Sequence, residues 1–112
     1  MKKNKTIYIS GKMTGCKNYN FLNFFRAERH LKKLGWNVIN PARESWHLLK
    51  KLNAKKFSDI PLIEFIREDS KNIIEKSDAI YMLKGWEYST GANAEFHLAK
   101  WKGIKIYYQD SL

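Results

Sequence analysis

Residues 79–95, AIYMLKGWEYSTGANAE, contain a predicted strand, a sharp turn and the start of a helix. The apolar run from Ala79 to Leu83 is typical of a buried strand, and Gly85 permits a tight turn after it. The residues from Ser89 onwards are typical of a helix N-terminus. A strand that leads directly into a helix is the repeating unit of α/β folds, so this stretch predicts that fold class.

The end of this turn has the features of an anion site. Ser89, Thr90 and Gly91 stand where the helix begins, so free backbone N–H groups and the positive end of the helix dipole face the space above them. The alternative interpretation is an ordinary helix cap followed by a turn glycine. Glu95 follows about one turn later, where we expect a carboxylate to cap, to pair or to react.

The rest of the chain repeats this alternation of strand and helix. Further strands are predicted at residues 6–10, 36–40 and 104–108, and helices at residues 20–34, 42–53, 61–76 and 91–102. Pro61 is expected at the first position of its helix. This alternation predicts right-handed βαβ units and a parallel sheet with helices on both faces. We therefore expect one domain over residues 1–112, a small doubly wound, flavodoxin- or Rossmann-like sheet of about four to five strands. Such folds bind ligands beyond the C-terminal ends of their strands.

Composition limits the function classes. The chain of 112 residues contains no apolar run long enough to span a bilayer, and its N-terminus lacks the core of a signal peptide. We therefore expect a cytoplasmic protein that makes no membrane contact. The single cysteine, Cys16, excludes an internal disulfide, and three scattered histidines do not form a metal-binding motif. We expect neither a metal nor a cofactor.

The formal net charge of +10 favours polyanions or phosphorylated ligands. No nucleic-acid recognition motif accompanies this charge. Many of the lysines fall on predicted solvent faces, where they serve solubility: Lys32, Lys33, Lys50, Lys51, Lys55 and Lys56. Nucleic-acid binding is therefore an alternative that the sequence does not favour.

Two acidic residues fall on helix faces that are predicted to be buried. Asp69 lies within the apolar arc of helix 61–76, and Glu95 lies on the apolar side of helix 91–102. The first arc consists of Leu62, Phe65, Ile66, Ile73 and Ile74, and the second of Ala92, Ala94, Phe96, Leu98, Ala99 and Trp101. Buried carboxylates are costly unless they are hydrogen-bonded, so this pattern indicates paired acids with shifted pKa values. The alternatives are that Asp69 pairs with Arg67 or a lysine and that Glu95 favours the helix dipole.

Aromatic residues near the turn are candidates for stacking on a flat base. They are Trp86 and Tyr88, with Tyr19 and Trp46 from neighbouring loops. The alternative is that they belong to the ordinary core, which is the interpretation we favour for Trp46. A Walker loop and a dinucleotide-binding glycine motif are both absent from the sequence.

Four segments of the chain together resemble a known family. They are residues 8–15 (YISGKMTG), Asn40-Pro41, residues 78–87 (DAIYMLKGWE), and Ser89-Thr90-Gly91 with Glu95. Over nearly its whole length the chain resembles a family of small, mostly phage and prophage proteins of unassigned function. That family is itself similar to nucleoside 2-deoxyribosyltransferases and to 2′-deoxynucleoside 5′-phosphate N-hydrolases.

The resemblance implies roles for individual residues. Glu95 matches the nucleophilic glutamate of the enzymes, Asp69 matches their second acid, and Tyr8 matches their first-strand tyrosine. Ser89 and Gly91 match residues that help to hold a 5′-phosphate. We expect further contributions to substrate binding from Ser10, Gly11, Met13, Gly15, Trp86 and Thr90.

The resemblance also implies an activity, namely cleavage or transfer of the N-glycosidic bond of a 2′-deoxynucleoside or its 5′-monophosphate through a covalent glutamate intermediate. It implies a homo-oligomer whose neighbouring subunits help to complete the pocket, in the host-cell cytoplasm if the protein is phage-encoded. The alternative is a non-catalytic binder of nucleotides or nucleotide-derived signals. Departures from the enzyme pattern at His97, Asn93 and Lys12 leave open the base, the phosphorylation state and the choice between hydrolase, transferase and binder.

Overall fold

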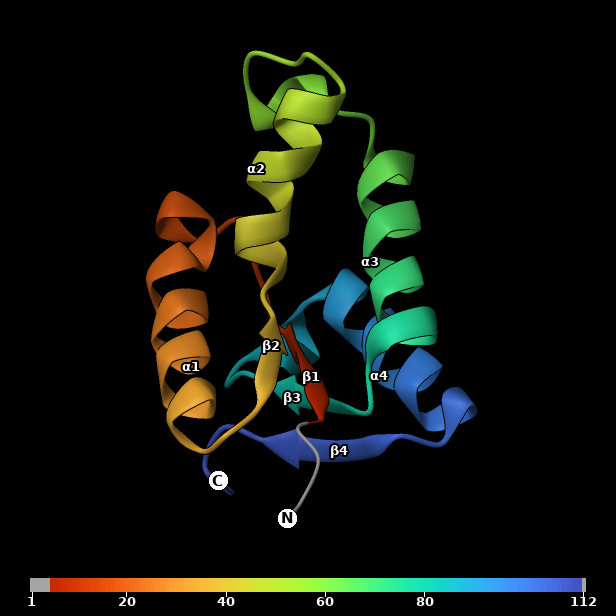
Figure 1. The fold of residues 1–112 in the computed structure, drawn as a ribbon. Helices are drawn as coiled ribbons and strands as arrows, with labels where there is room; N and C mark the ends of the chain where they lie inside the picture. The colour runs from red at the N-terminus through yellow and green to blue at the C-terminus, as the bar shows by residue number, and fades with distance from the viewer. Residues whose placement is uncertain (1–4, 112) are drawn as a thin grey trace.

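The computed structural model describes residues 5–111, in which four strands form one sheet in the order β2-β1-β3-β4 (Figure 1). The strands are β1 (Thr6–Ser10), β2 (Asn37–Ile39), β3 (Ala79–Met82) and β4 (Lys105–Tyr108). Each neighbouring pair is parallel. The strand order reverses between β1 and β3, which is where α/β folds open a crevice for a ligand. The predicted parallel sheet is confirmed, with four strands in a flavodoxin-like order.

Four α-helices connect these strands: α1 (Phe21–Lys33), α2 (Pro41–Lys51), α3 (Leu62–Lys76) and α4 (Thr90–Lys102). Three short 3-10 turns lie in the loops: η1 (Lys17–Asn20), η2 (Phe57–Asp59) and η3 (Trp86–Tyr88). Figure 1 shows α1 on one side of the sheet and α3 with α4 on the other. Within residues 5–111, no helix is both long enough and apolar enough to cross a membrane.

The central strand β1 sends alternate side chains into two different cores. Ile7 and Ile9 pack with Phe24 of α1 on one face, whereas Tyr8 packs with Ile73 of α3 and Ala99 of α4 on the other. This alternation is the ordinary period of a strand. The hydroxyl-bearing residues of β1 therefore lie on the face that α3 and α4 cover.

The side chain of Lys102 joins α3 to α4. Its Nζ donates to the carbonyl oxygens of Ile73, at 3.0 Å, and Ser77, at 2.7 Å. These carbonyls belong to the end of α3, where helix carbonyls lack an intrahelical partner. The bond therefore satisfies that helix end and fixes the two helices relative to each other.

The structure corrects two details of the predicted helices. Pro61 precedes α3 as its N-cap, with φ −58° and ψ 141°, and the helix begins one residue later than predicted. The predicted apolar arc of α3 is too broad, because Leu62, Ile66 and Ile74 are 72%, 48% and 51% exposed. Only a narrow stripe of α3 packs against the four-stranded sheet, so the residues on either side of that stripe face solvent.

The same correction applies to α4. Ala92 and Ala99 are buried as predicted, but Ala94 is exposed and Trp101 is 88% exposed. Small residues on the buried side bring α4 close to the sheet. The outer side of the helix therefore lies beyond the reach of neighbouring side chains.

Candidate functional site

The carboxylate of Glu95 receives two hydroxyl groups from β1. Tyr8 Oη donates to Oε2 at 2.9 Å, and Ser10 Oγ donates to Oε1 at 2.6 Å. Tyr8 and Ser10 are fully buried and lie two residues apart on β1, so both point toward α4, which carries Glu95. The structure therefore places the predicted Ser10 as a partner of Glu95.

Asp69 of α3 reaches the same tyrosine. Its carboxyl group lies close enough to the Tyr8 hydroxyl and to Glu95 for each group to shift the pKa of its neighbours, so the Tyr8 hydroxyl lies near both carboxyl groups. A single hydroxyl can donate to one carboxylate and accept from the other only if the second one is protonated. The structure thus brings together three residues that are far apart in the sequence.

The two acids have raised pKa values. Burial, the charge of Glu95 and the charge of Glu68 together raise the pKa of Asp69 to about 8. Burial raises the pKa of Glu95 to about 7, and the hydrogen bonds from Ser10 and Tyr8 oppose that rise. Because the two groups interact, they titrate as a pair, and the ionisation of one raises the pKa of the other.

Tyr8 keeps its own proton. Burial, followed by the charges of Asp69 and Glu95, raises the pKa of the Tyr8 hydroxyl well above its ordinary value. Tyr8 is therefore a permanent hydrogen-bond donor to Glu95. It does not compete with Asp69 as an acid.

The turn before α4 is held by Asn93, which sequence analysis treated only as a departure from the enzyme pattern. Its side-chain Nδ2 donates to the carbonyl oxygens of Ser89, at 2.8 Å, and Glu87, at 2.9 Å. Ser89 caps the helix, because its Oγ accepts the Ala92 N–H at 3.1 Å. The capping role of Ser89 is therefore confirmed. The N–H groups of Thr90 and Gly91 belong to the first turn, where they lack intrahelical acceptors.

The residues of the first loop serve different purposes. A Cβ added at Gly11 would lie 2.9 Å from Leu83 Cδ1, so glycine permits the close approach of this loop to the end of β3. Gly15 has φ +82°, a left-handed conformation that favours glycine. Met13 contributes to the wall of a cavity beside Asp69.

That cavity lies between α2 and α3 and has a volume of about 40 Å³. It is lined by Met13, Pro41, Glu44, Ser45, Leu48, Phe65, Glu68 and Asp69. The sequence pattern does not single out Glu44 and Glu68 as site residues. Glutamates are common on helix surfaces, so their presence does not indicate a site. The one signal in the sequence is that Glu44 lies near the Asn40-Pro41 segment and Glu68 lies next to Asp69.

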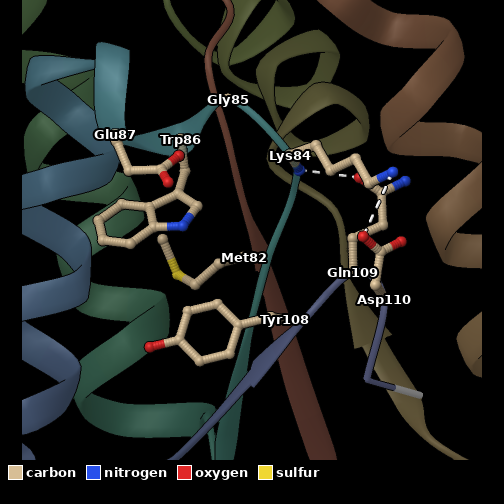
Figure 2. Close-up of a pocket in the computed structure, with 8 residues that line it drawn as sticks. All are labelled: Met82, Lys84, Gly85, Trp86, Glu87, Tyr108, Gln109 and Asp110. Carbon is tan, nitrogen blue, oxygen red and sulfur yellow. Dashed lines mark hydrogen bonds and ion pairs between the residues drawn. The ribbon is translucent and has the colours of Figure 1, made fainter.

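A larger pocket, of about 210 Å³, lies at the C-terminal ends of β3 and β4 (Figure 2). It is lined by Met82, Lys84, Gly85, Trp86, Glu87, Tyr108, Gln109 and Asp110. Figure 2 shows Trp86, Met82 and Tyr108 along one side and Lys84, Gln109 and Asp110 along the other. The Trp86 ring stacks on Phe96, with centroids 4.7 Å apart. The structure therefore does not bring Trp86 into the same pocket as Asp69.

Residues 5–111 contain no group of three or more histidine, cysteine, aspartate or glutamate side chains arranged to hold a metal ion.

Comparison with known proteins identifies the family of the chain. No curated protein matches its sequence. Residues 5–108, which include every residue of the Tyr8, Ser10, Asp69 and Glu95 cluster, match the model described as "Domain of unknown function (DUF4406)". The chain therefore belongs to the DUF4406 family.

Proposed function

We propose that the protein cleaves or transfers the N-glycosidic bond of a 2′-deoxynucleoside or its 5′-monophosphate. The observation that carries this proposal is the convergence of the Glu95 and Asp69 carboxyl groups on the Tyr8 hydroxyl. Glycosidic bonds are cleaved by such pairs, in which one acid is ionised and the other is protonated. The resemblance of these three residues to the catalytic residues of nucleoside 2-deoxyribosyltransferases supports the same assignment.

The geometry favours retention of configuration. Both carboxyl groups lie near the Tyr8 hydroxyl, which is 2.9 Å from Glu95 Oε2. Retaining glycosidases place their carboxyl groups roughly 5–5.5 Å apart, whereas inverting enzymes need roughly 6.5–9.5 Å to admit a water molecule. Two carboxyl groups beside one hydroxyl fit the shorter separation, so Glu95 acts as a nucleophile in this proposal.

In the first step, a carboxylate oxygen of Glu95 forms a bond to C1′ as the C1′–N bond breaks. The electrons of the broken bond pass to the base nitrogen, and Asp69 donates its proton to the departing base. Tyr8 and Ser10 hold the Glu95 carboxylate in place. The absence of a 2′-hydroxyl on the sugar eases the positive charge that develops at C1′.

In the second step, water attacks C1′ and the bond between C1′ and Glu95 breaks. The Glu95 carboxylate is restored, the proton of the water passes to Asp69, and 2-deoxyribose or its 5-phosphate is released. If a second base attacks in place of water, the product is a new deoxynucleoside. Both outcomes return the pair to its starting protonation state.

The first turn of α4 is the proposed site for a 5′-phosphate. The N–H groups of Thr90 and Gly91 and the positive helix end stabilise an anion. Asn93 holds the preceding turn in shape. Glu95 lies on the same helix, so the phosphate and C1′ would bind along one side of α4.

We also infer that the chain functions as a homo-oligomer. Ile63, Ile66 and Ile74 are exposed along one side of α3, the helix that carries Asp69. Exposed apolar side chains aligned in this way are typical of subunit interfaces. A cavity of about 40 Å³ does not enclose a nucleoside, so a second subunit that adds a wall beside Asp69 would complete the site.

A direct assay tests the proposed activity. Purified protein is incubated with the common 2′-deoxynucleosides and their 5′-monophosphates, and free base is measured by chromatography. Replacement of Glu95 by alanine is expected to reduce base release by at least about 10³-fold, because the nucleophile is lost. The control is Glu75→Ala, which removes an exposed glutamate from α3. Base release that survives Glu95→Ala contradicts the proposal, and thermal stabilisation by a nucleotide without base release favours a binding protein.

A further inference from the structure

The cavity beside Asp69 has walls of two kinds. Met13, Leu48 and Phe65 provide apolar surface, and Glu44, Glu68 and Asp69 provide carboxyl groups. Among the described residues that line it, none is cationic. The cavity therefore differs in charge from the protein as a whole, whose formal net charge is +10.

The polar groups of this cavity are mainly hydrogen-bond acceptors. The Ser45 hydroxyl already donates to the Ala42 carbonyl oxygen at 2.7 Å. The ion pairs formed within residues 5–111 involve neither Glu44 nor Glu68. Ionised carboxylates only accept hydrogen bonds. A ligand edge that enters this space must therefore bring donors, and a phosphate is repelled.

The cavity lies beside Asp69, which is the proposed proton donor for the C1′–N bond. Asp69 lines the wall of the cavity and also lies near the Tyr8 hydroxyl. The cavity therefore adjoins the site where Glu95 lies. In the proposed reaction, Asp69 protonates the departing base. The base must therefore lie on the α2 and α3 side of Glu95, with the sugar over Glu95 and the 5′ end toward α4.

We propose that Glu44 and Glu68 are specificity-determining residues that accept hydrogen bonds from the amino-bearing edge of the base. The inference rests on the proposed function and deepens it, since it assigns the substrate class as 2′-deoxynucleosides of amino-substituted bases. A volume of about 40 Å³ suits the edge of a base, so the rest of the ring would extend out of the cavity. The base then binds away from Trp86, which lines the separate pocket of Figure 2.

Matched pairs of substrates test this assignment, because deoxyadenosine and deoxyinosine differ only at C6, which carries an amino or an oxo group, and at the neighbouring N1, which accepts or donates a hydrogen bond. Deoxycytidine and deoxyuridine differ in the same way. For each pair, kcat/KM for base release and Kd by calorimetry are measured with wild-type protein. We expect a preference of about tenfold or more for the amino member, because an oxo group would face a carboxylate.

Variants show whether the two glutamates cause this preference. Glu44→Gln, Glu68→Gln and the double variant keep the shape of the side chain, while the amide also offers a donor to an oxo group. We expect each single variant to reduce the ratio of amino to oxo substrate, and the double variant to abolish it. Glu75→Gln removes the same charge from the exposed side of α3 and should leave the ratio unchanged. Circular dichroism confirms that each variant is folded.

The outcomes separate this inference from the proposed function. Base release without an amino preference, or a preference that the double variant retains, overturns the role of the glutamates and leaves the proposed reaction standing. Preferential binding of amino members without base release supports the glutamates and contradicts the reaction. Failure to bind or cleave any of the four nucleosides or their 5′-monophosphates overturns both.

Discussion

The Ser10 hydroxyl donates to Glu95 Oε1 across 2.6 Å and joins the end of β1 to the inner side of α4. This bond favours the ionised carboxylate and opposes the effect of burial on the pKa of Glu95. Ser10 is therefore a positioning residue in the proposed reaction. Its contribution can be measured separately from that of Tyr8, which binds the other oxygen.

Replacement of Ser10 by alanine is expected to raise the pKa of Glu95, because one of its two hydrogen bonds is lost. The rising limb of the pH profile of kcat/KM should therefore move to higher pH. Activity should fall about tenfold at pH 6.5, where fewer molecules hold an ionised Glu95, and less at pH 8. A uniform loss at all pH values would contradict this role of Ser10.

The wild-type pH profile is expected to be a narrow bell. Activity requires ionised Glu95 and protonated Asp69, so it should rise through the pKa of Glu95 at about 7 and fall through the pKa of Asp69 at about 8. Asp69→Asn removes the proton donor and should reduce kcat about 10²- to 10⁴-fold. The falling limb should disappear in this variant. A variant that keeps this limb would show that another group supplies the proton.

Asp69 also affects the stability of the folded protein, and its contribution depends on pH. The pKa of Asp69 is raised in the folded protein, so the folded state holds a proton that the unfolded state releases near pH 4. Stability therefore decreases as pH rises from about 4 toward 8, the folded pKa. Asp69→Asn avoids this loss and should raise the melting temperature at pH 8 by about a few degrees, but not at pH 4. Equal effects at both pH values would contradict burial of a titrating acid.

The exposed isoleucines of α3 provide a test of oligomerisation. Ile66→Glu places a charge in the middle of the proposed interface, while its effect on the monomer core should be small because Ile66 is half exposed. We expect a lower molar mass in light scattering after size-exclusion chromatography. Leu34→Glu, at the exposed end of α1, is the matched control. A monomeric wild-type protein would contradict the proposal.

The fold could be predicted well because its causes are local. Apolar runs such as residues 79–83 and end glycines such as Gly35 mark the strands and helix ends in the sequence itself. The acids Asp69 and Glu95 were also found locally, because a carboxylate interrupts an apolar helix face. Their meeting at Tyr8 depends on the sheet order, which brings β1 beside β3.

Other features of the site could not be predicted, because they depend on how far each helix is covered. Trp101 has the spacing of a core residue but lies beyond the reach of neighbouring side chains. Glu68 has the spacing of a surface residue but lines the cavity beside Asp69. Asn93 holds the turn by donating to three backbone carbonyl oxygens, and the sequence does not indicate where those carbonyls point.

Strand β1 sends side chains to both faces of the sheet, and this limits which mutations the protein can accept during evolution. Because neighbouring residues of a strand point to opposite sides, deletion of one residue near Tyr8 would exchange the two sets of side chains. Isoleucine would then face Glu95, and hydroxyl groups would face the core around Phe24. Substitutions in β1 can alter the site while the fold survives. An insertion or deletion in β1 would disrupt both the site and the fold. Descendants of this chain should therefore vary in the residues of β1 but not in its length.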